Sequence, residues 1–190
     1  MPLVLASASP RRREILAQLG LVFEVESADV DESPSPSETP AAYVRRLAED
    51  KARTVANRRG VGAVLGADTV VCVGDALLTK PIDDQDATRM LGLLSGREHS
   101  VLTGVFVIAE GLAAGVVAET RVWFRPLTPE TIAAYVERGE GRDKAGSYAI
   151  QGLGAGLVER IEGSYHNVVG LPAAESLRLL AKVGALSSWP

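Results

Sequence analysis

The 190-residue sequence has one cysteine, two histidines and no long apolar run, and each shortage excludes a class of protein. The single cysteine, Cys72, cannot form a disulfide within the chain, which fits a reducing compartment. Two histidines are too few for a His-rich zinc site. No apolar run approaches the roughly 20 residues that cross a bilayer, and the N-terminus lacks the pattern of a secretory signal. We therefore expect a cytoplasmic protein with no membrane partner.

Positive charge and the common phosphate-binding loops are also missing. The net charge is −4, so the surface as a whole does not attract nucleic acid, and we expect no nucleic-acid partner. Neither the loop Gly-x-x-x-x-Gly-Lys-Ser/Thr nor a Gly-x-Gly-x-x-Gly motif between strand and helix occurs. Phosphate binding would therefore depend on a local cluster of Lys and Arg.

Strand and helix patterns alternate along the chain and predict an α/β fold. The predicted helices begin near residues 10, 40, 84, 129 and 173, several of them at a Ser-Pro or Thr-Pro pair that favours a helix start. Residues 99–109 and 116–124 are long strand patterns joined by a Gly-containing turn, which indicates a hairpin. A hairpin among strand–helix units predicts one domain, residues 1–190, with a mixed twisted sheet flanked by helices.

Three consecutive arginines, Arg11 to Arg13, occupy the first turn of the first predicted helix. The partial positive charge of a helix N-terminus makes each cation there unfavourable by roughly 0.3–1 kcal/mol. An anion bound by the arginines, by backbone N–H groups and by the hydroxyls of Ser7 and Ser9 would explain the pattern. A solvated basic helix start explains it equally well, and both alternatives stay open.

Asp68 interrupts an apolar stretch that has strand character on both sides. A carboxylate in such a stretch is costly to desolvate unless it is paired or binds a metal ion. The small residues Gly66 and Ala67 before it leave room for a ligand to approach the backbone. An aspartate in a loop between two strands is at least as good an interpretation of the local pattern. Glu32, Lys51 and Lys80 likewise have ordinary interpretations as solvated surface residues.

The order of the motifs resembles the Maf family of nucleotide pyrophosphatases nearly from end to end, without a block that departs from its pattern. The matching blocks are Ser7-x-Ser9-Pro10-Arg11-Arg12, Glu32, Lys51-Ala52, Gly66-Ala67-Asp68-Thr69, Lys80-Pro81, Leu94-Ser95-Gly96-x-x-His99-x-Val101-x-Thr103, Asp143-Lys144-Ala145-Gly146-x-Tyr148-x-Ile150-Gln151-Gly152 and Gly163-Ser164-Tyr165-x-Asn167-Val168-Val169-Gly170-Leu171-Pro172. The resemblance implies an elongated, two-lobed fold with a central cleft, of the inosine-triphosphate pyrophosphatase type.

The resemblance also implies a reaction and roles for single residues. Water would attack the α-phosphorus of a nucleoside triphosphate and release the monophosphate and pyrophosphate. Asp68 would be the proton acceptor, and because an ordinary aspartate is a weak base for free water, a Mg²⁺ or Mn²⁺ ion held by Asp68 and Glu32 would assist it. The predicted substrate-binding residues are Ser7, Ser9, Arg11, Arg12, Lys51, Thr69, Lys80 and Gln151.

Three positions resemble the branch of the family that acts on dTTP and UTP, namely Arg11, Thr69 and Gln151. The neutral amide of Gln151 offers both a donor and an acceptor to a uracil or thymine edge. The alternatives are the same reaction on another base such as 7-methyl-GTP, or a non-enzymatic regulator of septum formation in cell division. A homodimer is left open as a partner.

Overall fold

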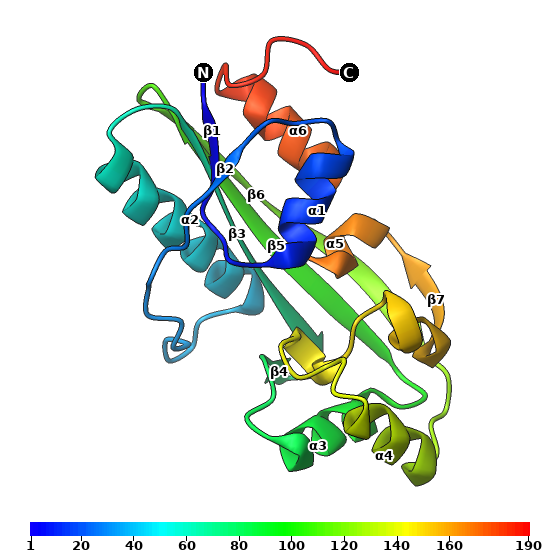
Figure 1. The fold of residues 1–190 in the computed structure, drawn as a ribbon. Coiled ribbons are helices and arrows are strands. Elements are labelled where there is room, and N and C mark those ends of the chain that lie inside the picture. Colours follow the sequence, from blue (N-terminus) through cyan, green and yellow to red (C-terminus); the bar gives the residue numbers. More distant parts are fainter. The chain divides into compact units, whose positions relative to one another are not determined.

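The computed structural model describes residues 1–190, and these form two compact units built from separate stretches of chain. The first unit comprises Met1–Asp68, Thr103–Ala118 and Gly170–Pro190, and the second comprises Thr69–Leu102 and Glu119–Val169. Three long strands contribute residues to both units: β3 (Ala63–Val73), β5 (Glu98–Ala109) and β6 (Leu112–Phe124) (Figure 1).

Seven strands form one sheet in the order β2–β1–β3–β5–β6–β7, with β4 paired to β3. The four shorter strands are β1 (Leu3–Leu5), β2 (Glu24–Val25), β4 (Ala76–Leu78) and β7 (Val158–Glu162). Strand β1 runs parallel to β2 and β3, whereas β4 is antiparallel to β3 and β7 is antiparallel to β6. The prediction of a mixed sheet flanked by helices is therefore confirmed.

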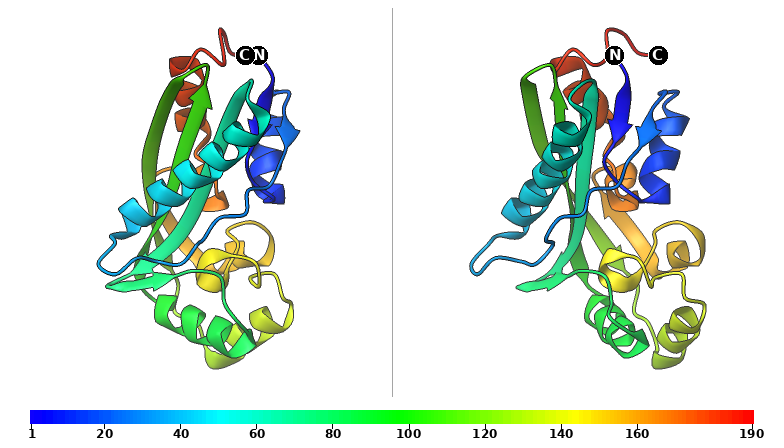
Figure 2. Two further views of the ribbon diagram at one scale, coloured as in Figure 1. Left: turned by 90° about the vertical axis from the view of Figure 1, so that its left-hand side faces the viewer. Right: turned by 60° about the vertical axis from the view of Figure 1, so that its left-hand side comes forward.

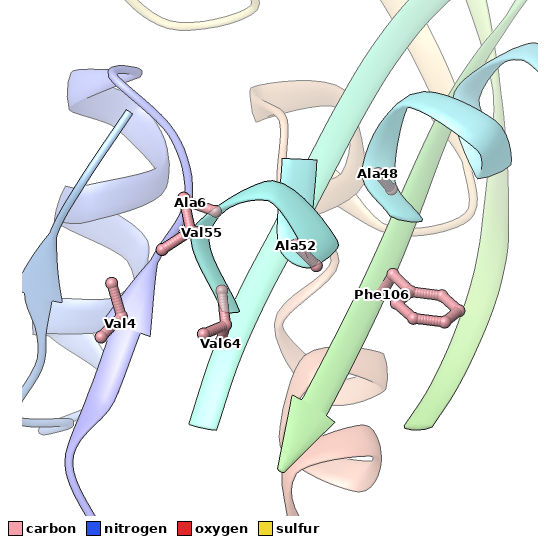
Figure 3. Packing of buried hydrophobic residues seen from close by; sticks show 7 residues of the cluster. All are labelled: Val4, Ala6, Ala48, Ala52, Val55, Val64 and Phe106. Carbon is pink, nitrogen blue, oxygen red and sulfur yellow. The ribbon is translucent and has the colours of Figure 1, made fainter. Parts of the chain in front are cut away.

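The first unit carries helices α1 (Pro10–Gln18), α2 (Pro40–Arg59) and α6 (Ala173–Lys182). Helix α2 lies on one side of the strands, and α1 and α6 lie on the other side (Figure 2). The Thr39 side chain accepts a hydrogen bond from the Ala42 N–H and so caps α2. Apolar side chains, all but Phe106 small, pack α2 against the sheet, and the cluster comprises Val4, Ala6, Ala48, Ala52, Val55, Val64 and Phe106 (Figure 3).

Gly66 sets how closely α2 approaches β3. A Cβ atom at this position would lie 2.2 Å from the Ala48 carbonyl oxygen and 2.7 Å from the Ala52 nitrogen. No side chain fits in that space. The interpretation that the small residues before Asp68 leave room for a ligand is wrong for Gly66, because the helix backbone fills the room.

The second unit carries α3 (Asp84–Leu94), α4 (Pro129–Glu137), α5 (Tyr165–Val169) and two short 3₁₀ helices, η1 (Ala145–Ser147) and η2 (Gly152–Leu157). Helix α3 packs against α4 and η1. None of the helices in either unit is both long and apolar enough to cross a bilayer.

Local details depart from the expectation in a few places. Residues 63–73 form one continuous strand, so Asp68 lies within β3 and not in a loop between two strands. The predicted hairpin is present, but β6 begins at Leu112 and not at residue 116, so only Glu110 and Gly111 connect β5 and β6, at φ values of 47° and 82° that suit a tight turn.

Candidate active site

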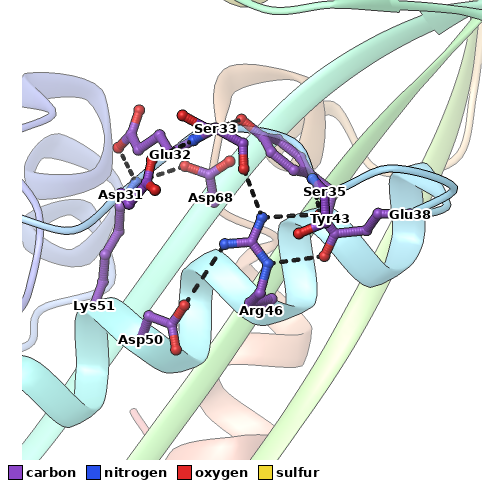
Figure 4. Close-up of polar contacts among 10 residues, drawn as sticks. All are labelled: Asp31, Glu32, Ser33, Ser35, Glu38, Tyr43, Arg46, Asp50, Lys51 and Asp68. Carbon is purple, nitrogen blue, oxygen red and sulfur yellow. Dashed lines mark hydrogen bonds and ion pairs between the residues drawn. The ribbon is translucent and has the colours of Figure 1, made fainter.

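A lysine and two carboxylates meet in the first unit. The Lys51 Nζ lies 2.6 Å from Oε1 of Glu32 and 2.6 Å from Oδ1 of Asp68 (Figure 4). The Lys51 and Asp68 side chains are only 10% and 13% exposed, whereas the Glu32 side chain is 49% exposed. The largely buried ammonium is thus neutralised by two carboxylates, one of which is open to solvent.

The positions of these three side chains follow from the elements that carry them. Lys51 lies on the face of α2 that is otherwise apolar and buried, one turn from Leu47 and Val55. The close packing of α2 at Gly66 brings the buried face of the helix to the middle of β3. Asp68 lies there, two residues after Gly66. Glu32 belongs to the segment that connects β2 with α2.

Two side chains of α2 hold this connecting segment. The Tyr43 hydroxyl donates a 2.8 Å hydrogen bond to the Glu32 carbonyl oxygen, and Arg46 donates one of 3.1 Å to the Ser33 carbonyl oxygen (Figure 4). Arg46 also forms two 2.8 Å hydrogen bonds with the Glu38 carboxylate, and they lower the pKa of Glu38 to about 2. Burial, together with the charges of Asp68 and Glu32, raises the pKa of Tyr43 to about 12, so its hydroxyl stays a donor.

Arg12 is the arginine of the basic cluster that is built into this part of the fold. Its Nη1 donates to the Ala67 carbonyl oxygen at 2.8 Å and to Ser7 Oγ at 3.1 Å, and its Nε donates to the Gly170 carbonyl oxygen at 2.9 Å. Burial lowers the pKa of Arg12, and the nearby Asp68 charge opposes this shift. The guanidinium therefore joins α1, β3 and the start of the C-terminal segment next to Asp68.

The structure brings together five of the predicted site residues in one network, Ser9 is hydrogen-bonded to one of them, and Lys80 and Gln151 lie in the other unit. Ser7, Arg12, Glu32, Lys51 and Asp68 belong to one network of contacts in the first unit. Ser9 donates its N–H to Ser7 Oγ at 3.2 Å, Arg11 is half-buried on α1, and Thr69 follows Asp68 in β3. Lys80 and Gln151 belong to the second unit, where Lys80 is exposed after β4 and Gln151 directly precedes η2. The roles of all these residues toward a substrate stay predictions.

The donor types of Glu32 and Asp68 fit a divalent cation. Mg²⁺ prefers carboxylate oxygens and is commonly held by one or two carboxylates, with water and phosphate oxygens completing its shell. The contact with Lys51 uses Oδ1 of Asp68 and leaves Oδ2 for a cation. No group of three or more His, Cys, Asp or Glu side chains lies together in the chain, so such an ion would depend on these two carboxylates and the substrate.

Comparison with known proteins places this arrangement in a family. The family described as Maf-like protein matches residues 2–183, which is nearly the whole chain. The chain belongs to the Maf family.

Several relatives in the Maf family are similar over almost their full length and carry the name dTTP/UTP pyrophosphatase. The protein of that name from Vibrio cholerae is 53% identical over 181 residues, which cover 95% of this chain and 97% of the relative. Those from Myxococcus xanthus and Geobacter sulfurreducens are 51% and 50% identical, and the alignments cover 98% and 97% of this chain and 95% and 97% of the relatives.

Two motif blocks of this Maf protein serve its architecture. His99 is 2% exposed, its Nε2 lies 2.9 Å from the Tyr148 hydroxyl, and its ring packs edge-on against Phe124 and Tyr148. Asn167 is completely buried, and its amide donates to the Val101 carbonyl oxygen and to Thr120 Oγ1. Motif spacing could not separate these core residues from substrate ligands, because both kinds of residue are polar and belong to the same motif blocks.

Sequence patterns did not reveal the residues that hold the site in place. Tyr43, Arg46 and Glu38 belong to none of the motifs. The sequence contains one signal for Tyr43: it lies eight residues before Lys51 and therefore on the same face of α2.

Proposed function

We propose that this chain hydrolyses dTTP and UTP to the nucleoside monophosphate and pyrophosphate. The observation that carries the proposal is the buried Lys51 ammonium between Glu32 and Asp68, which places one positive and two negative groups within hydrogen-bond distance. The names of relatives at 50–53% identity support the choice of substrates.

The residues of the cluster divide the work of the reaction. Asp68 accepts the proton of a water molecule whose oxygen attacks the α-phosphorus. The bond between the α-phosphorus and the oxygen that bridges to the β-phosphorus breaks, and pyrophosphate leaves with that oxygen. Lys51 and Lys80 spread the negative charge that develops on the leaving group. Lys51 also holds Asp68 in one orientation through its 2.6 Å contact with Oδ1.

Glu32 and Asp68 are the residues that would hold the divalent cation, and the 49% exposure of Glu32 leaves this side accessible. When bound, the ion would lower the pKa of the attacking water and neutralise phosphate charge. We assign Ser9 and Arg11 to the phosphate chain directly and Thr69 to the nucleoside, whereas the buried Ser7 and Arg12 side chains act there by holding this part of the fold together.

Gln151 is the residue that we assign to base recognition. A uracil or thymine ring presents two carbonyl acceptors on either side of one N–H donor, whereas cytosine has an amino group in place of one carbonyl. A fixed amide partner therefore mismatches cytosine, and an unpaired polar group costs roughly 1–3 kcal/mol. A 5-methyl group is a methylene-sized difference, which is hard to reject strongly, so the same base site accepts both thymine and uracil.

The test is hydrolysis of dTTP and UTP by the purified chain in ¹⁸O-labelled water. The products are separated by ion-exchange chromatography, and mass spectrometry measures the ¹⁸O content of each. We expect unlabelled pyrophosphate and a monophosphate that carries one ¹⁸O atom, because water attacks the α-phosphorus. Release of the diphosphate and inorganic phosphate, or label in pyrophosphate, would contradict the proposed reaction.

A further inference from the structure

A second polar network lies in the second unit and encloses the segment that carries Gln151. The Glu140 carboxylate accepts three hydrogen bonds: Oε1 accepts from the Tyr135 hydroxyl at 2.9 Å and from the Gly154 N–H at 2.8 Å, and Oε2 accepts from the Leu153 N–H at 2.9 Å. The Tyr135 hydroxyl in turn accepts from the Ala149 N–H at 3.1 Å. Tyr135 and Glu140 thus bind the backbone on both sides of Gln151.

The geometry at the start of η2 shows what this network does for Gln151. Gln151 is the N-cap residue of η2, with φ −82° and ψ 163°, and its own side chain makes no capping hydrogen bond. The N–H groups of the second and third residues of a helix normally find such a cap in the N-cap side chain. Here Glu140 accepts from both of them, Leu153 and Gly154, so the Gln151 amide is not needed for capping.

Two glycines show how closely the segment is wrapped around the network. A Cβ atom on Gly152 would lie 2.4 Å from Glu140 Oε2, and its φ of +64° is in the left-handed region. A Cβ atom on Gly154 would lie 1.9 Å from the Ala149 carbonyl oxygen and 2.9 Å from the Tyr135 hydroxyl. The backbone of residues 149–154 therefore has one conformation that fits both Tyr135 and Glu140.

The protonation states of the two side chains match these roles. Burial raises the pKa of Glu140, but the hydrogen bonds from Leu153, Gly154 and Tyr135 together outweigh it, and the pKa is lowered overall. Burial raises the pKa of the Tyr135 hydroxyl. At neutral pH Glu140 is consequently an acceptor for all three donors, and Tyr135 is protonated and donates to it.

We propose that Glu140 and Tyr135 are positioning residues for base selection, because they fix the 149–154 backbone and leave the Gln151 amide available to the edge of a pyrimidine base. The inference rests on the proposed function, since it assigns a support to the residue that distinguishes dTTP and UTP from CTP. An amide held in one place discriminates between donor and acceptor patterns, whereas an amide on a loose segment adapts to either.

The test compares kcat/KM for dTTP with that for CTP in the parent and in the variants Glu140→Gln and Tyr135→Phe. Glu140→Gln keeps the size of the side chain but presents an NH₂ group to an N–H donor, and Tyr135→Phe removes the link between Ala149 and Glu140. We expect the kcat/KM for dTTP divided by that for CTP to fall about tenfold in each variant. The matched control is Glu137→Gln, an exposed residue at the end of α4, the helix that carries Tyr135, with the same change of charge as Glu140→Gln; it should keep the parent ratio.

A double-mutant cycle separates positioning from a general loss of structure. In a Gln151→Ala background, Glu140→Gln should change the ratio by less than about twofold, because the residue through which it acts is gone. An equal loss for dTTP and CTP in Glu140→Gln, or an undiminished change of the ratio in the Gln151→Ala background, would overturn the inference.

A second measurement does not depend on turnover. Amide hydrogen exchange at Leu153 and Gly154 should become faster in Glu140→Gln than in Glu137→Gln, and unchanged protection would overturn the inference even if the enzyme is active. If the parent hydrolyses no triphosphate, the proposed function and the role in base selection are both wrong. If Glu140→Gln nevertheless loses protection at Leu153 and Gly154, Glu140 still supports the backbone of this segment.

Discussion

At the scale of single residues, Lys51 is the group on which the candidate site depends. It is the cation within reach of both Glu32 and Asp68, and it lies on an otherwise apolar helix face. Sequence order placed all three residues in one family pattern, but it could not show that one lysine contacts both carboxylates. That contact depends on the close approach of α2 to β3 at Gly66, which no local pattern encodes.

We predict that Lys51→Met lowers stability more than Asp68→Asn does. Lys51→Met leaves two carboxylates near each other without a cation, whereas Asp68→Asn leaves Lys51 paired with Glu32. Because Glu32 is about half exposed, we expect a modest extra loss of about 1–2 kcal/mol in the free energy of unfolding. Urea denaturation at pH 7 measures it, with the exposed Lys182→Met as a control. A larger loss in Asp68→Asn would contradict the assignment.

We also predict that His99 makes the protein sensitive to acid. Burial lowers the pKa of His99 from 6.5 to about 4, so the folded state binds its proton less readily than the unfolded state does. The stabilisation from keeping His99 neutral is complete above pH 6.5 and is lost as the pH falls toward 4, by up to about 3 kcal/mol.

The measurement for His99 is urea denaturation at pH 7, 6, 5 and 4.5. The parent and the control His166→Gln should both lose stability over this range, because both keep His99. His166 is a suitable control because it is the other histidine of the chain and is not in the core. His99→Gln should be less stable at pH 7 and should show a smaller loss on acidification. The same pH slope in all three proteins would rule out His99 as the cause.

At the scale of elements, most helix and strand positions followed from the sequence, because Thr-Pro starts, apolar faces and the hairpin turn are local signals. The exceptions have physical reasons. A strand of three residues such as β4 and a helix of five residues such as α5 are too short to show a periodic pattern of apolar residues. The local pattern around Asp68 allowed a loop as well as a strand, since a strand interior accepts a carboxylate only when a partner such as Lys51 is present, and that partner comes from another element.

The composition of the segment from Ser33 to Pro40, rich in Ser and Pro, predicts that it is mobile without ligand and quieter with it. In the structure Arg46 of α2 holds it through Ser33 and Glu38. We predict that Arg46→Met speeds amide hydrogen exchange at residues 33–38 and lowers kcat/KM for dTTP about fivefold, because the backbone next to Glu32 is released.

The control for this segment is Arg45→Met, which changes the neighbouring exposed arginine of the same helix. Hydrogen exchange detected by mass spectrometry, with and without a non-hydrolysable dTTP analogue, gives the comparison. Equal exchange in the parent and in Arg46→Met would show that the arginine does not restrain the segment. Equal exchange with and without the analogue would show that the ligand does not order it.

At the scale of the whole molecule, the hairpin among strand–helix units predicted the mixed sheet with its flanking helices, and both are present. The assembly of each compact unit from separate stretches of chain was not accessible from the sequence. Strand and helix patterns describe neighbours along the chain, whereas β3, β5 and β6 are each shared by two units, and only their packing determines where one unit ends.

We predict that the enzyme needs Mg²⁺ or Mn²⁺. Hydrolysis of dTTP should stop in excess chelator and return when either ion is added, because carboxylate and phosphate oxygens are hard ligands that suit these ions. Glu32→Gln should raise the Mn²⁺ concentration needed for half-maximal rate and should weaken Mn²⁺ binding measured by electron paramagnetic resonance. Full activity in chelator would contradict a metal requirement.

The central claim is that Asp68, held by Lys51, performs the hydrolysis of dTTP and UTP. The measurement that tests it most directly is pyrophosphate release from dTTP, UTP, CTP, GTP and 7-methyl-GTP by the parent and by Asp68→Asn at equal protein concentration. We predict that the parent favours dTTP and UTP about tenfold or more over the others. We expect Asp68→Asn to lose at least about a hundredfold in kcat/KM on both substrates with a nearly unchanged unfolding midpoint. Turnover by Asp68→Asn within a few-fold of the parent, or a parent preference for 7-methyl-GTP, would contradict the account.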